Sequence, residues 1–95
     1  MKIKCLYRKN LKLSPEKLAA QTGHVVGNII QKAIRRLQMI DKNTVIVVLK
    51  ASDKKFEEKR QELKQSYPPV VYYLQVDLGL TEVPAGTETV IGLIE

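Results

Sequence analysis

In the middle of the chain the sequence reads Val45-Ile46-Val47-Val48-Leu49, an apolar run that is mostly β-branched. Such a run is typical of a strand, and its lack of polar alternation favours a sheet that is covered on both faces, as in α/β proteins. Ser52 and Asp53 follow and predict the start of a charged helix that extends to about Ser66. The sequence therefore predicts a buried strand that is followed directly by a helix.

The flanking segments complete the order of elements. Alternating side chains predict a strand at residues 3–8, and apolar runs predict strands at residues 70–74 and 89–94. A long helix is predicted from Ser14 to about Leu37, because Ser14 is a good N-cap and Pro15 fits the first helical position. The order β-α-β-α-β-β, with right-handed crossovers, predicts a three-layer α/β/α domain with a mixed four-stranded sheet and an antiparallel last strand.

The composition describes one ordered domain over residues 1–95, with 44% hydrophobic and 27% charged residues. No apolar run approaches the ~18 residues that span a membrane. The N-terminus alternates charged and apolar residues, unlike a secretory signal. The chain holds one cysteine and one histidine, Cys5 and His24, which excludes an internal disulfide and a Cys/His zinc site. We therefore expect a cytoplasmic protein without a metal or another cofactor.

The net charge of +6 is distributed unevenly. Residues 1–50 contain 11 Lys and Arg against two acids, whereas residues 51–95 contain five against eight. Basic residues follow one another closely in the first strand and the start of the long helix. A basic cluster of this kind is expected of a surface that contacts a phosphate backbone, although small soluble proteins also carry basic surfaces.

The connection between the last two predicted strands concentrates groups that can do chemistry. Asp77 closes one strand, Thr89 opens the next, and Thr81 and Thr87 lie between them. A plain hairpin needs only two to five connecting residues, and this connection is roughly twice as long. Functional side chains gather on loops held by a rigid sheet, but Asp, Gly, Pro and Thr are also ordinary turn residues.

The start of the long helix carries a second set of polar groups. One face of it bears a polar row within an arc of about 60°, which comprises Lys17, Gln21, His24 and Asn28. Such a row is usually the solvated face of a helix. Exposed faces are, however, mostly filled with Glu and Lys, whereas this row offers donors and acceptors suited to a ligand.

Together the two segments resemble the archaeal and eukaryotic-type peptidyl-tRNA hydrolases. The first resembles the family stretch Arg-x-Asp-Leu followed by Gly-Lys-x-Ala-Ala-Gln-x-x-His, at residues 8–11 and 16–24. The second resembles Asp-Ala-Gly-x-Thr-Gln-x-x-x-Gly-Thr-x-Thr, at residues 77–89. Both occur in the family order at opposite ends of one domain, so the resemblance covers nearly the whole chain and implies the same α/β/α fold.

The resemblance implies hydrolysis of the ester that joins a peptide to tRNA, or of an N-blocked aminoacyl-tRNA, by direct attack of water. The sequence has no Gly-x-Ser-x-Gly elbow, which agrees with a mechanism without a covalent nucleophile. The family carries over a catalytic set comprising Lys17, Asp77, Thr81 and Thr89. In this set Asp77 orients the water, Lys17 stabilises negative charge, and the threonines position the water or the carbonyl.

The remaining expectations concern supporting groups and partners. Gln21, His24 and Thr87 are further site candidates; a lone helical histidine such as His24 is as easily a structural residue as a general base. The expected tRNA contacts are Arg8, Lys9 and Lys12, and the family implies a homodimer. Four positions depart from the family pattern, namely Asn10, Glu16, Leu78 and Glu82. They motivate an alternative, a non-catalytic RNA-binding or protein-interaction module on the same fold.

Overall fold

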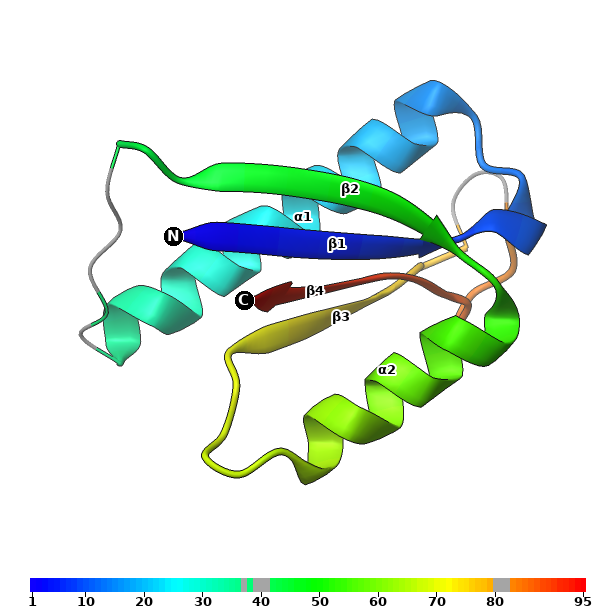
Figure 1. Ribbon diagram of the computed structural model, residues 1–95. Helices are drawn as coiled ribbons and strands as arrows, with labels where there is room; N and C mark the ends of the chain where they lie inside the picture. The colour runs from blue at the N-terminus through cyan, green and yellow to red at the C-terminus, as the bar shows by residue number, and fades with distance from the viewer. Residues whose placement is uncertain (37, 39–41, 80–82) are drawn as a thin grey trace.

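The computed structural model describes residues 1–36, 38, 42–79 and 83–95 (Figure 1). Its elements follow the predicted order β-α-β-α-β-β, with one short 3-10 helix, η1, after the first strand. They are β1 (Lys2–Arg8), η1 (Lys9–Leu11), α1 (Pro15–Arg35), β2 (Val45–Ala51), α2 (Asp53–Gln65), β3 (Tyr72–Val76) and β4 (Glu88–Ile94). Among these residues no helix is both long and apolar enough to cross a membrane.

The four strands form one mixed sheet in the order β2-β1-β4-β3. β1 and β2 are parallel, whereas β4 lies antiparallel between β1 and β3. This confirms the predicted antiparallel last strand. Since β1, β2 and β3 therefore run in the same direction, their C-terminal ends meet at one end of the sheet. The first turns of both helices lie at that end, which positions the site described below.

The two helices cover opposite faces of the sheet, α1 on one side and α2 on the other (Figure 1). Under α1 the core is formed by Ile3, Cys5, Val25, Ile29 and Val90, all fully buried. Under α2 it is formed by Leu6, Phe56, Leu63 and Ile91. The predicted three-layer α/β/α arrangement is therefore confirmed.

Gly92 in β4 lets α1 approach the sheet closely. A Cβ built on Gly92 would lie 2.3 Å from Val25 Cγ1 and 2.8 Å from Ile29 Cδ1, well inside van der Waals contact. Any other residue at Gly92 would therefore push α1 away from β4. Because the site is built between α1 and the end of β4, this contact helps to fix its geometry.

Both helices begin as their sequences predict. The Ser14 hydroxyl accepts from the backbone N–H of Lys17 at 3.1 Å, and the Ser52 hydroxyl accepts from the N–H of Lys55 at 3.2 Å. Each cap satisfies one of the orphan donors of a first helical turn. The Ser14 cap fixes the backbone of Lys17 at the end of the sheet where the parallel strands terminate.

Two details of the sequence interpretation are wrong. The third strand begins at Tyr72 and not at Val70, because its pairing with β4 runs from Tyr72↔Leu93 to Val76↔Glu88. The run in β2 is not covered on both faces: the exposed fractions of Val45, Ile46, Val48 and Leu49 are 54%, 50%, 41% and 43%. β2 is an edge strand, and a single helix per face does not cover the width of four strands.

Candidate active site

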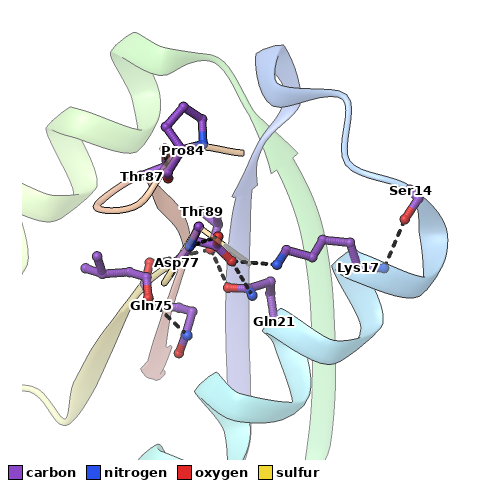
Figure 2. Close-up of polar contacts among 10 residues, drawn as sticks. Ser14, Lys17, Gln21, Gln75, Asp77, Pro84, Thr87 and Thr89 are labelled. Carbon is purple, nitrogen blue, oxygen red and sulfur yellow. Dashed lines mark hydrogen bonds and ion pairs between the residues drawn. The ribbon is translucent and has the colours of Figure 1, made fainter. Parts of the chain in front are cut away.

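Lys17 reaches from the first turn of α1 to Asp77, which directly follows β3. Lys17 Nζ lies 2.5 Å from Asp77 Oδ1, and the exposed fractions of the two side chains are only 11% and 3%. Figure 2 shows the lysine pointing across the sheet end toward the carboxylate. These two residues, which the resemblance assigns to one catalytic set, are 60 positions apart in the sequence and form an ion pair in the structure.

The backbone around Asp77 holds its carboxylate in place. Asp77 N–H donates to Thr87 O, and Gly86 N–H donates to Asp77 O, both at 2.8 Å. The N–H of Gly79 donates to Asp77 Oδ2 at 2.7 Å, the pattern of an Asx turn. Gly79 has a φ of 78°, and a Cβ there would lie 2.6 Å from Ala85 N, so glycine is needed at this donor position.

Asp77 is ionised at neutral pH, because these donors stabilise its negative form. The hydrogen bond from Lys17 holds the pKa of the Asp77 carboxyl below its ordinary value, and the Gly79 N–H lowers this pKa further. Burial acts in the opposite direction and is outweighed. The carboxylate is thus a fixed hydrogen-bond acceptor and a weak base.

Gln21 links this pair to Thr89. Gln21 Nε2 donates to Asp77 Oδ1 at 3.2 Å, and the Thr89 hydroxyl donates to Gln21 Oε1 at 2.7 Å (Figure 2). Gln21 is nearly buried and Thr89 is fully buried. The four side chains therefore form one connected network that runs from Thr89 through Gln21 and Asp77 to Lys17. In this network Thr89 contacts Gln21 and is shielded from solvent.

A β-bulge explains why Thr89 faces α1. The register passes from Gln75↔Val90 to Val76↔Glu88, so Thr89 is the extra residue on β4. Thr89 and its neighbour Val90 both point to the α1 side, where Val90 joins the core and Thr89 meets Gln21. A regular strand would turn one of them to the other face. Bulges often re-aim a side chain next to an active site.

Two other predicted site residues, His24 and Thr87, lie outside this network. The His24 side chain is exposed, and only its backbone carbonyl has a described contact, with Asn28 Nδ2 at 2.8 Å. The Thr87 hydroxyl donates to Pro84 O at 2.7 Å and so braces the loop after Asp77. Thr81 lies outside the described residues, as do Leu37 and Glu82.

The predicted tRNA contacts differ from one another in their surroundings. Lys9 is exposed in η1, and Lys12, also exposed, follows it. Arg8 is instead engaged within the fold: its Nε donates to Asp53 Oδ1 at 2.9 Å and its Nη1 to Glu88 O at 3.2 Å. Its guanidinium also lies 5.7 Å from the centre of the Phe56 ring.

The site thus joins a buried lysine–aspartate pair, a glutamine and a threonine, in the order in which the family motifs hold them. A family model described as Peptidyl-tRNA hydrolase PTH2 matches residues 1–94. The chain belongs to this peptidyl-tRNA hydrolase family. The match covers both motif segments and every described element.

Two structural features of this peptidyl-tRNA hydrolase family member were missed by the sequence interpretation. The first is the Gly79 N–H on the Asp77 carboxylate, which the Asp-x-Gly spacing of an Asx turn signals. The second is the bulge at Thr89, which has no local sequence signal because it arises from pairing with β3.

Proposed function

We propose that this chain hydrolyses the ester of peptidyl-tRNA, or of an N-blocked aminoacyl-tRNA, by direct attack of water. The observation that carries the proposal is the buried Lys17–Asp77 pair at the end of the sheet, in a member of this family. An ester of this kind is already activated, so a protein needs mainly to place a water and to stabilise an oxyanion.

Asp77 is the acceptor that orients the water. Its Oδ1 already accepts from the Lys17 ammonium and the Gln21 amide, whereas Oδ2 accepts a hydrogen bond only from the Gly79 N–H among the described groups. A carboxylate oxygen has two acceptor sites, so Oδ2 retains one for the water. Because the pKa of Asp77 is lowered, it acts more by orientation than by holding the proton of the water.

Lys17 stabilises the negative charge. Its ammonium has three hydrogens, and Asp77 takes one of them, which leaves donors for the developing oxyanion. The water oxygen bonds to the ester carbonyl carbon, the bond from that carbon to the ribose oxygen breaks, and the proton passes to the ribose oxygen. Gln21 and Thr89 hold Asp77 in position from the buried side. In this scheme Thr89 is a positioning residue.

The direct test is release of free tRNA from N-acetylaminoacyl-tRNA by the purified protein. We expect release far above the spontaneous rate, and loss of it in Lys17→Ala. Binding of the substrate without release would contradict hydrolysis and favour the non-catalytic RNA-binding module. Since the proposed substrate arises in translation, the proposal also favours the cytoplasm as the location of the protein.

The proposed tRNA contacts are Lys9 and Lys12, because both are exposed next to the first turn of α1. The double variant Lys9→Ala/Lys12→Ala should raise KM and leave kcat nearly unchanged, since phosphate contacts act on ground state and transition state alike. It should also flatten the dependence of log affinity on log salt. An unchanged salt slope would show that these lysines are not at the RNA.

We also propose that two copies pair through β2. Its exposed apolar residues contrast with the opposite edge, β3. That strand is short and lies opposite the bulge in β4, and the Tyr72 carbonyl accepts a hydrogen bond from Lys32 Nζ at 2.8 Å. Such devices protect an edge strand from pairing, and β2 has only Lys50 near its end. Antiparallel pairing of two β2 strands about their centre would place Val48 of one protomer against Val48 of the other and so bury both.

Sedimentation at several protein concentrations tests the β2 dimer. We expect a dimer for the wild type and a monomer for Val48→Lys, which places a charge at the centre of the strand. Val76→Lys, an exposed residue at the end of β3, is the matched control. A wild type that stays monomeric at all concentrations would contradict the pairing.

A further inference from the structure

A groove of about 720 Å³ lies beside the start of α1, on the face of the sheet that α1 covers. Tyr7, Leu13, Pro15 and Leu18 supply apolar wall surface. Its polar rim carries Lys9, Lys12 and Lys50, and its lining, within the described part of the chain, includes no carboxylate. Aromatic and apolar surface next to cations is the combination that binds unpaired nucleotides, because bases stack and phosphates pair with lysine.

The groove adjoins the proposed catalytic network. Leu18, which lines it, directly follows Lys17 in α1. Tyr7, which lines its floor, pairs across the sheet with Val90, the neighbour of Thr89. A nucleotide in the groove would therefore have its sugar close to Lys17 and Asp77.

Two smaller hollows continue the groove along the end of the sheet. One of about 190 Å³ shares Lys9 and Lys50 with the groove and adds Lys55 from the first turn of α2. Another of about 350 Å³ shares Lys50 and Lys55 and extends along α2, where its lining includes Lys59 but also Glu58 and Glu62. Lys50 lines all three hollows. A basic path thus leads from the start of α1, past the end of β2, and ends at Lys55 in the first turn of α2, because glutamates line the hollow beyond it.

We propose that this groove binds the unpaired 3′ nucleotides of the RNA, with a base stacked on Tyr7 and the backbone held by Lys50. The inference rests on the proposed RNA substrate and adds the direction in which its 3′ strand runs across the protein. The terminal ribose lies at Lys17, because the ester must meet Asp77, and the preceding nucleotides run toward Lys50 and Lys55. Neither Tyr7 nor Lys50 belongs to the family motifs quoted above.

The test is equilibrium binding of a labelled, short single-stranded RNA that ends in CCA, followed by fluorescence anisotropy. Tyr7→Leu should weaken binding by about fivefold or more, the loss expected for one stacked base, whereas Tyr7→Phe should bind as the wild type does. Melting curves of both variants separate a binding defect from misfolding, since Tyr7 packs partly against the core.

Lys50→Ala should lower the slope of log affinity against log salt by about 0.7, the value for one phosphate contact of a single strand. Lys42→Ala is the matched control, because Lys42 is exposed before the opposite end of β2. Equal slopes for the two variants, or full binding by Tyr7→Leu, would overturn the inference.

The same measurements keep this inference separate from the proposed hydrolysis. Binding that depends on Tyr7 and Lys50 in a protein without ester turnover would support the groove and reject the hydrolase. Turnover that depends on Lys17, together with failure of the wild type to bind the short RNA, would support the hydrolase and reject the groove.

Discussion

Two pairs of a cation and an aspartate join a helix start to a strand end at the same end of the sheet, and their charges are arranged in opposite ways. In one pair, Arg8 at the end of β1 holds Asp53, the first residue of α2. In the other, Asp77 after β3 holds Lys17 in the first turn of α1. The first pair puts an acid at a helix N-terminus, where the helix dipole favours it.

Lys17 occupies the corresponding place in α1, where the dipole disfavours a cation. It is also almost buried, whereas half of the Asp53 side chain is exposed. The Arg8 pair therefore follows the local rules of stability, and the Lys17 pair departs from two of them. Departures of this kind are expected at functional sites. The comparison predicts that the Lys17 pair serves chemistry and the Arg8 pair serves the fold.

Removal of either charge of the Lys17 pair has the largest expected effect. Lys17→Ala and Asp77→Asn should each lower kcat/KM on N-acetylaminoacyl-tRNA by well over tenfold, because the oxyanion loses its cation or the water its acceptor. Asp53→Asn makes the same acid-to-amide change in the other pair and is the control. It should keep activity within about twofold, since the two sites share no partner.

Melting curves of the same variants separate a loss of activity from a loss of stability. Lys17→Ala should lower the melting temperature by only a few degrees, because the Gln21 amide and the Gly79 N–H still hold the Asp77 carboxylate and relief of a cation at the helix start offsets part of the loss. Asp53→Asn should lower it. Full activity of Lys17→Ala, or a loss in Asp53→Asn as large as in Asp77→Asn, would remove the distinction between the pairs.

The second prediction concerns the buried support of Asp77. Thr89→Val removes the donor to Gln21 Oε1 and leaves a buried acceptor unsatisfied, which costs about 1–3 kcal/mol in the free energy of unfolding. With Gln21 less restrained, kcat should fall severalfold while KM stays nearly constant. Denaturant titration and steady-state kinetics measure the two effects.

Thr22→Val is the matched control for Thr89→Val. Among the described residues the buried Thr22 hydroxyl has no hydrogen-bond partner, so a methyl group should leave stability unchanged or raise it. If both variants lose the same stability, burial of threonine and not the contact with Gln21 determines the effect of Thr89.

The sequence predicts the frame of this site well. Helix caps at Ser14 and Ser52 are local signals, and the element order with right-handed crossovers leaves few topologies. The motif resemblance assigns Lys17 and Asp77 to one site, and the structure has their side chains in contact. These features depend on neighbours in the chain or on a pattern that spans it.

The features that escaped prediction depend on contacts between distant residues. The capture of Arg8 by Asp53 joins residues 45 positions apart, and nothing near Arg8 in the sequence indicates it. The exposure of Ile46 and Val48 follows from the position of β2 at the edge, which the apolar run itself does not encode. The burial of Thr89 follows from the bulge opposite β3.

The third prediction has a smaller effect and tests the role of Arg8. Arg8→Lys keeps the charge but loses the planar fork that reaches both Asp53 and Glu88 O, so the melting temperature should fall by about 4 °C. In Arg8→Ala, which removes the charge, the slope of log RNA affinity against log salt should stay at the wild-type value, in contrast to Lys9→Ala/Lys12→Ala. A flattened slope in Arg8→Ala would instead show that Arg8 contacts the RNA, as the sequence motif predicts.

The smallest expected effect is on the titration of the two aspartates. The pKa of Asp53 is lowered mainly by its hydrogen bond from Arg8 and then by that from Asn10, and the pKa of Asp77 mainly by that from Lys17. Since both folded-state pKa values lie below the ordinary 3.8, each carboxylate stabilises the fold above about pH 3.8 and loses this contribution as the pH falls through its folded pKa. Activity should therefore show no acid limb from Asp77 at pH 5 or above.

Carbon-13 NMR titration of both carboxyl groups in one sample checks the two shifts independently. Lys17→Ala should raise the pKa of Asp77 only part of the way to 3.8, because the Gly79 N–H remains, and should leave Asp53 unchanged. Arg8→Ala should raise the pKa of Asp53 and leave Asp77 unchanged. If either substitution moves both carboxyl groups, the pairs are coupled across the sheet end, and a change in stability at Arg8 could no longer be separated from a change in chemistry at Lys17.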